Sequence, residues 1–90
     1  MNTIVTRKTV AEELAAYLNR DISLARLVDW AEDTLNDGEL DEQDAELLRD
    51  ILARVGLADV REFGLSWDDC YSFLSQLGYT TQVKILPLAA

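Results

Sequence analysis

The sequence contains no histidine, and its 90 residues include only one cysteine, one proline and four glycines. Without histidine there is no imidazole general base, no Ser-His-Asp triad, and no zinc or iron site with imidazole ligands. One cysteine cannot build an intramolecular disulfide framework, so the chain suits a reducing interior. No glycine-rich phosphate loop is present either. We therefore expect a protein that is not an enzyme and that holds no cofactor.

The sequence also lacks long apolar segments. No run approaches the roughly 20 residues needed to cross a bilayer, and the first residues lack the apolar region of a signal peptide. Hydrophobic residues make up 49% and charged residues 28% of the chain, which is ordinary for a globular protein. Ninety residues are enough for one domain with a modest core. We expect a single domain over residues 1–90 in the cytoplasm of a bacterium.

Basic residues are missing from residues 29–48, which carry nine of the seventeen acidic residues. The remaining acids and bases balance, so this stretch accounts for the net charge of −9. Such a charge argues against nucleic acid and anionic membranes as partners, because phosphate groups are bound mainly by Lys and Arg. It permits a basic protein partner or cations. The alternative is that acidity only keeps a small cytoplasmic protein soluble.

Capping signals predict two helices in the first half. Thr9, with Glu12 three residues later, forms a capping box and predicts a helix that ends near Asn19. Ser23 is a second N-cap. Trp30 lies at the flank of the apolar stripe that follows, where it either packs on a neighbouring helix or anchors an interface. The stripe has helical spacing and comprises Leu24, Leu27, Val28, Ala31 and Leu35.

A turn ending in Gly38 separates this helix from a third one. Asp41 is its expected N-cap, with Asp44 near the N3 position, where the free N–H groups and the helix dipole stabilise acids. Gly56 is expected just past the end of the helix. Residues 57–63 predict a short helical turn.

A last helix is predicted from the capping box of Ser66 and Asp69 to Gly78. Apolar residues lie on nearly every side of this helix, so we expect it to be the most buried one. Cys70 lies within it, beside acids and without a basic neighbour. Because nearby acids raise a thiol pKa and free cysteine packs as a small hydrophobe, we interpret Cys70 as a core residue.

Residues 79–87 change in character, because their β-branched and aromatic residues favour a strand that Pro87 ends. A lone strand is not stable, and residues 3–7 are the other strand candidate. The sequence thus predicts a mainly α fold: a small domain of four to five helices with a short two-stranded ribbon joining the N- and C-termini. The alternative is that either terminal segment pairs across a homodimer.

The loop around Gly38 resembles an EF-hand calcium loop in which Gly38 occupies position 6. Leu35 stands at position 3, where a ligand belongs. A similar pattern 26 residues later, over residues 59–70, has Arg61 and Phe63 in ligand positions. A degenerate EF-hand-like calcium-binding helix-loop-helix protein is therefore the alternative function. Its metal ligands would be Asp33, Asp37, Asp41 and Asp44.

Three segments resemble a group of short bacterial proteins of uncharacterised function. They are ISLARLVDWAEDTLNDGEL, LLRDILARVGLADVREFGLSWDDC and FLSQLGY. The resemblance covers most of residues 22–79. It implies an independent domain and brings no catalytic residues with it.

The leading expectation is a small acidic protein-interaction module that is a monomer or a homodimer. Its acidic corner would bind a basic surface of a protein partner, with opposite potentials raising the association rate and selecting the partner. Inhibitors, immunity proteins and antitoxin-like regulators fit this description, as do subunits of larger assemblies. The residues expected to carry the binding are Asp29, Trp30, Glu32, Asp33 and Glu39.

Overall fold

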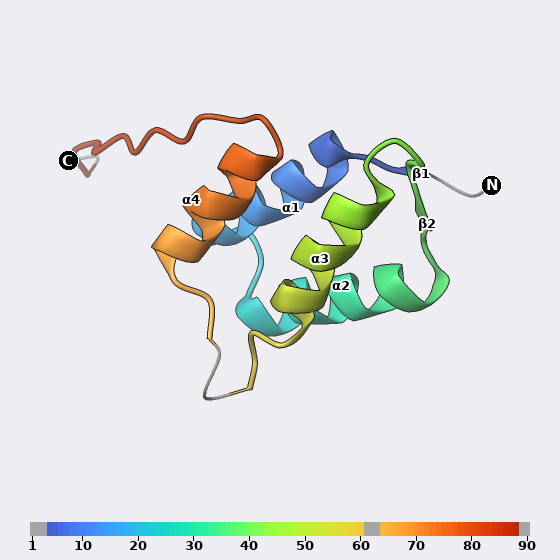
Figure 1. Cartoon of the computed structure of the whole chain (residues 1–90). Coiled ribbons are helices and arrows are strands. Elements are labelled where there is room, and N and C mark those ends of the chain that lie inside the picture. Colours follow the sequence, from blue (N-terminus) through green and yellow to red (C-terminus); the bar gives the residue numbers. More distant parts are fainter. Residues whose placement is uncertain (1–3, 61–63, 89–90) are drawn as a thin grey trace.

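The computed structural model describes residues 4–60 and 64–88, which fold into one small, mainly helical unit (Figure 1). This confirms the predicted fold class. In chain order the elements within these ranges are β1 (Ile4–Val5), α1 (Arg7–Leu18), α2 (Leu24–Asp37), β2 (Glu39–Leu40), α3 (Ala45–Gly56) and α4 (Trp67–Gln76).

The core is built from one face of each helix, and α2 and α3 pack closely against each other. In the predicted stripe of α2, Leu27, Val28 and Ala31 are buried and Leu24 is partly buried. Leu35 is exposed, and Thr34 is buried instead. Burying one Leu or Ile side chain stabilises the fold by about 1.5–3 kcal/mol. The largest fully buried side chains are Val10, Leu14, Leu27, Val28, Leu48, Ile51, Leu52, Val55, Cys70 and Leu77.

Helix α1 begins three residues earlier than the sequence predicts. Thr6 is the N-cap, and its hydroxyl accepts a hydrogen bond from the Thr9 amide at 3.3 Å. The Thr6 amide in turn donates to the Thr9 hydroxyl at 3.2 Å, which completes a capping box without Glu12. Thr6 has the extended backbone of an N-cap residue, with φ −116° and ψ 176°. The N-cap prediction for Ser23 is confirmed by the bond from the Arg26 amide to its hydroxyl.

The N-terminal strand pairs with the connection between α2 and α3, not with the C-terminal segment. β1 and β2 are parallel, with Ile4 opposite Glu39 and Val5 opposite Leu40. The predicted ribbon between the termini is therefore wrong. In Figure 1 residues 79–88 run from the end of α4 away from β1, toward the opposite side of the domain. Residues 79–88 form no strand. Residue 3 of the predicted strand lies outside the described part of the chain.

The start of α3 also differs from the prediction. Asp44 is the N-cap and makes no capping hydrogen bond, because its carboxylate lies 2.8 Å from the Arg7 guanidinium. Asp41 instead accepts a hydrogen bond from the Gln43 amide in the preceding turn. The helix includes Gly56 and ends there. Residues 57–60 form hydrogen-bonded turns, and residues 61–63 of the predicted helical turn lie outside the described residues.

Helix α4 begins with the predicted capping box. The Asp69 amide donates to the Ser66 hydroxyl at 3.1 Å, and the Ser66 amide donates to the Asp69 carboxylate at 2.9 Å. Arg54 of α3 fixes this corner by donating to the Gly64 carbonyl at 3.0 Å. The expectation that α4 is the most buried helix is wrong, because Trp67 at its start is 53% exposed. Only one face of α4 reaches the core.

Candidate protein-interaction surfaces

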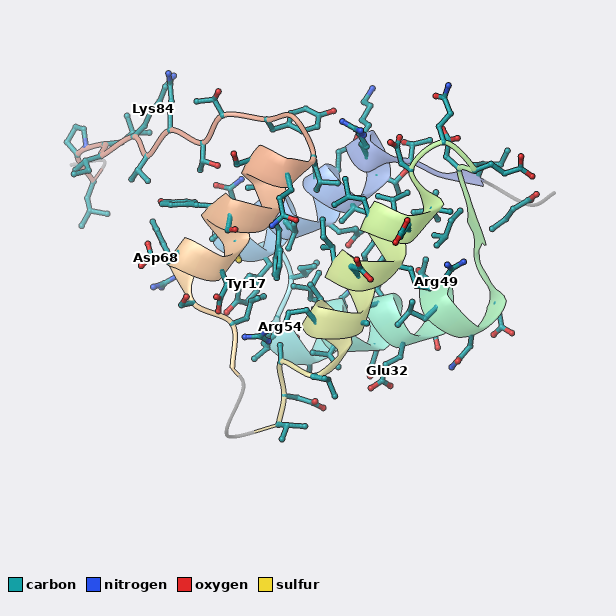
Figure 2. The ribbon with its side chains drawn as sticks, viewed as in Figure 1. Tyr17, Glu32, Arg49, Arg54, Asp68 and Lys84 are labelled. Carbon is teal, nitrogen blue, oxygen red and sulfur yellow. The ribbon has the colours of Figure 1, made fainter. Side chains whose placement is uncertain are left out.

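The first candidate surface is acidic and follows α2 and the segment after it. Asp29 and Asp33 lie one helical turn apart on α2, and Glu32 and Glu39 are exposed as well. Figure 2 shows Glu32 on the α2–α3 half of the domain, the half that also carries Arg49. We call the exposed acids of this region the acidic surface: Asp29, Glu32, Asp33, Asp37, Glu39, Glu42 and Glu46.

The acidic surface has little internal neutralisation. Within the described residues the ion pairs are Arg7–Asp44, Lys8–Glu12 and Arg54–Asp69. Of the nine acids between residues 29 and 48, only Asp44 takes part in one of them. The seven acids of the acidic surface are therefore exposed and make no ion pair within the described residues.

The five residues predicted to carry binding do not lie in equivalent environments. Asp29 and Asp33 are exposed on α2, and Glu39 is exposed on β2. The Glu32 side chain runs close to the end of α3, because a Cβ atom at Gly56 would lie 3.6 Å from its Cγ. Trp30 is partly buried and packs against the core. Of the two roles considered for it, packing and anchoring an interface, this position corresponds to packing. The acids, and not the indole, thus form the accessible part of this surface.

The loop that resembles an EF-hand does not have the geometry of one. Gly38 has an extended backbone with φ −78°, where a calcium loop needs a sharp turn. The Asp44 carboxylate is held by Arg7, and Asp41 accepts a backbone hydrogen bond. Among the described residues, no group of three or more His, Cys, Asp or Glu side chains is placed to hold a metal ion. The structure does not bring together Asp33, Asp37, Asp41 and Asp44.

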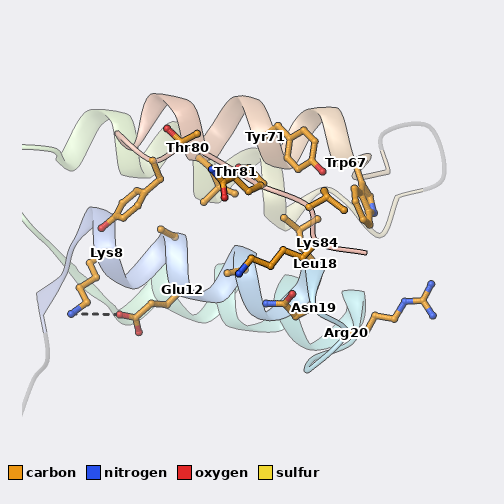
Figure 3. Close-up of a pocket in the computed structure, with 16 residues that line it drawn as sticks. Lys8, Glu12, Leu18, Asn19, Arg20, Trp67, Tyr71, Thr80, Thr81 and Lys84 are labelled. Atoms are coloured by element: carbon orange, nitrogen blue, oxygen red, sulfur yellow. Dashed lines mark ion pairs between the residues drawn. The ribbon is translucent and has the colours of Figure 1, made fainter. Parts of the chain in front are cut away.

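The second candidate surface is a groove of about 730 Å³ between α1, α4 and the segment that follows α4. Figure 3 shows Trp67 and Tyr71 of α4 on one side and, on the other, Glu12 and Leu18 of α1 with Asn19, which caps this helix. The two aromatic rings meet edge to face at 5.9 Å. The lining also includes Ala11, Ala15, Leu74, Tyr79 and Val83.

The charge of the groove is opposite to that of the acidic surface. Its lining contains three bases, Lys8, Arg20 and Lys84, and one acid, Glu12, which lies 4.0 Å from Lys8. Sequence reasoning missed this groove, because it requires knowing that α1 and α4 are neighbours. The signal that was available is the pair of small residues, Ala11 and Ala15, on one face of the first helix.

The segment after α4 is the most exposed apolar part of the described chain. We call residues 79–88 the C-terminal arm. Its last backbone hydrogen bond to the described domain runs from the Tyr79 amide to the Leu74 carbonyl at 2.9 Å. Beyond this bond the exposed fractions are 57% for Val83, 93% for Ile85, 75% for Leu86 and 96% for Leu88. The arm thus presents both apolar side chains and backbone groups that have no partner among the described residues.

Cys70 is fully buried in the core, as the sequence predicts. Burial, and to a smaller extent the charge of Asp69, raise the pKa of its thiol to about 11. The thiol is therefore protonated near neutral pH, and it is neither a nucleophile nor a metal ligand in this state.

Among the described helices, none combines the length and the apolar character needed to cross a membrane. Comparison of the chain with protein families, with curated proteins and with solved structures gives no match.

Proposed function

We propose that this chain is a small protein-interaction module of the bacterial cytoplasm, and that its acidic surface binds a basic surface of a partner protein. The observation that supports this proposal most directly is the set of exposed acids on α2, β2 and the start of α3 that have no ion pair within the described residues. These side chains are therefore accessible for ion pairs with another molecule.

The charges are close enough to act together. Asp29 and Asp33 are separated by four residues of helix, or about 6 Å along its axis. This is shorter than the Debye length of about 8 Å at physiological salt. One exposed ion pair contributes only about 0.2–1 kcal/mol, but a patch of one sign raises association rates by about 10–10³ and disfavours partners of the same sign.

A binding role fits the structure better than a catalytic one. The carboxylates of the acidic surface do not line the groove, and the buried thiol of Cys70 is protonated near neutral pH. An inhibitor, immunity or antitoxin-like protein that covers the basic site of its target would need features seen here: a folded helical frame and a surface on which exposed acids gather.

A charge-matched pair of variants tests the proposal. The surface variant carries Asp29→Asn, Asp33→Asn and Glu39→Gln. The control carries Asp21→Asn, Asp59→Asn and Asp68→Asn, which remove the same number of exposed acids elsewhere. Each tagged protein is used to capture partners from cells of its host, and the affinity of the captured partner is then measured at low and high salt.

We expect the wild type and the control to retain a basic partner that high salt releases. We expect the surface variant to bind it at least about tenfold more weakly, a loss of about 1.4 kcal/mol. Equal binding by the two variants, or an affinity that does not respond to salt, would contradict an electrostatic interface. Recovery of the protein without a partner would also count against the proposal.

A further inference from the structure

The groove between α1 and α4 has a basic lining, although the net charge of the chain is −9. Lys8, Arg20 and Lys84 line it, and Glu12 is the one acid among its described lining residues. Within the described residues, Arg20 and Lys84 make no ion pair. Lys8 lies 4.0 Å from Glu12, and both of these side chains are largely exposed. The three bases are therefore accessible to a negatively charged ligand.

These bases are spread along the groove and are not gathered at one point. Lys8 lies in the first turn of α1 and Arg20 follows the end of this helix, so the two are twelve positions apart. At about 1.5 Å per helical residue, their backbones are separated by about 18 Å along the helix axis. Figure 3 shows Lys8 at one end, Arg20 at the other and Lys84 between them. A ligand that pairs with both end bases must be long and must carry an acid near each end.

Apolar and aromatic side chains share the lining with these bases. Trp67 is 53% exposed, and its ring meets the ring of Tyr71 edge to face. Tryptophan is enriched among the residues that anchor a binding partner. The groove volume of about 730 Å³ also lies within the range of roughly 300–1,000 Å³ that is typical of ligand sites. The groove thus suits a ligand that has apolar groups as well as acids.

The backbone of the C-terminal arm offers a third kind of contact. Residues 79–84 line the groove, and after the Tyr79 amide the arm makes no backbone hydrogen bond to the described residues. A bound peptide can pair its own N–H and C=O groups with such a segment, and main-chain bonds of this kind add affinity. A fatty acid has no N–H groups and only one carboxylate. The groove therefore fits a peptide better than a small amphiphilic anion.

We propose that the groove binds an acidic and apolar segment of a partner protein, whose acids pair with Lys8 and Arg20 while an apolar side chain packs on Trp67. An extended chain rises about 3.3 Å per residue, so the distance of about 18 Å corresponds to five or six residue steps. The bound segment thus has two acids with about four or five mostly apolar residues between them.

The acidic surface does not oppose this binding. None of its seven acids lines the groove, and Figure 2 shows Lys84 of the arm well away from Glu32 of the acidic surface. Charges separated by more than about 8 Å are largely screened at physiological salt. The bases of the groove therefore attract the segment in spite of the net charge. This inference does not rest on the proposed function, because the partner of the acidic surface is basic.

Selection from a library of random peptides tests the class of ligand. The full-length protein is the bait at physiological salt. Peptides are kept only if they also bind the variant with Asp29→Asn, Asp33→Asn and Glu39→Gln, which removes ligands of the acidic surface. We expect the enriched sequences to contain acids on both sides of a mostly apolar stretch. No enrichment, or enrichment of sequences without acids, would overturn the proposal while leaving the role of the acidic surface intact.

The affinity of one enriched peptide, measured by fluorescence anisotropy, locates its binding site. Lys8→Gln together with Arg20→Gln should weaken binding about tenfold, because two exposed ion pairs are lost. Arg26→Gln together with Arg49→Gln is the matched control, since both bases are exposed and neither lines the groove. The control should keep the wild-type affinity. An equal loss in both double variants would mean that the peptide responds only to overall charge, which would contradict a site in the groove.

Substitution of Trp67 tests the apolar contact. Trp67→Ala should weaken binding of the same peptide at least about tenfold, whereas Trp67→Phe should keep most of the affinity because an aromatic ring remains. Circular dichroism checks that the helices are intact, which we expect because the side chain is exposed. Unchanged binding by Trp67→Ala would refute the proposed contact. Displacement of the peptide by micromolar decanoate would assign the groove to small amphiphiles and would likewise overturn the proposal.

Discussion

Arg20 and Gly78 occupy the same position in two helix-ending motifs of the same geometry. In each motif this residue donates its amide hydrogen bond to the carbonyl three residues earlier, at 3.0 Å. The next residue donates to the carbonyl five residues earlier, at 2.8 Å after α1 and 2.9 Å after α4. This pattern is the Schellman motif. The shared position is left-handed, with φ 65° at Arg20 and φ 94° at Gly78.

Arg20→Gly should therefore stabilise the protein. A non-glycine residue in the left-handed region costs about 1–2 kcal/mol, and the greater freedom of glycine in the unfolded chain cancels about 0.4–1 kcal/mol of the gain. We expect a net increase of roughly 0.5–1 kcal/mol in the free energy of unfolding. Urea denaturation measures it.

The control and the reciprocal change isolate the backbone effect. Arg20→Ala keeps the strained backbone and removes the guanidinium, so it should give no such gain. Gly78→Ala should lower the free energy of unfolding by about 1 kcal/mol. The positive φ value disfavours alanine, although a Cβ atom at this position would lie no closer than 3.8 Å to its nearest neighbour, Arg7 Nη1. If Arg20→Gly proves less stable than the wild type, the arginine side chain contributes more than the strain costs.

Gly38→Ala should be destabilising for a different reason. Its φ of −78° suits any residue, but a Cβ atom there would lie 2.5 Å from the Thr34 carbonyl oxygen and 2.9 Å from the Thr34 methyl group. The helix backbone cannot give way cheaply, so we expect a loss of about 1–3 kcal/mol. Thermal and urea unfolding measure this loss.

Gly56→Ala is the matched control, because Gly56 is the last residue of α3 and its nearest neighbour would be Glu32 Cγ at 3.6 Å. Alanine is the better helix former, so this change should raise stability by up to about 1 kcal/mol. A loss of similar size in both variants would show that the close approach at Thr34 is not what fixes Gly38.

These positions show what could be predicted from the sequence and what could not. The caps at Ser23 and Ser66 follow from local patterns, and they are confirmed. The start of α1 is missed because Thr6 and Thr9 stand three residues apart and satisfy the same capping rule. Asp44 is missed as an N-cap because its carboxylate binds Arg7, a residue 37 positions away.

Long-range pairing explains the larger errors. Val5 is an equally good strand residue whether it pairs with residues 39–40 or with the arm, and only the packing of the helices decides between them. The acidic surface was found because it is continuous in sequence and depends on composition alone. The groove joins Ala15 of α1 with Trp67 of α4, and no local pattern predicts that contact.

Calcium should not bind to the loop around Gly38. The would-be ligands do not converge, and Asp44 already neutralises Arg7 at 2.8 Å. Calorimetry with calcium up to millimolar concentrations should therefore give no saturable heat, either for the wild type or for Asp33→Ala and Asp37→Ala variants. Saturable heat that is lost in either variant would show that the loop rearranges around the ion.

The capping carboxylate of Asp69 should make stability depend on pH in the acidic range. Hydrogen bonds from the amide and hydroxyl of Ser66, with a smaller effect of the Arg54 charge, hold the pKa of Asp69 below its usual value of 3.8. A carboxyl group with a lowered folded-state pKa contributes stability above its unfolded pKa, and this contribution is lost as pH falls through the folded value. Asp69→Asn should therefore be less stable than the wild type near neutral pH, and the difference should shrink below about pH 4.

Asp68→Asn is the control, because this exposed neighbour makes no hydrogen bond to the Ser66 cap. The pH profile of its stability should run parallel to that of the wild type. Urea denaturation across this range measures the profiles, and a difference between Asp69→Asn and the wild type that persists unchanged to low pH would assign the effect to side-chain shape and not to charge.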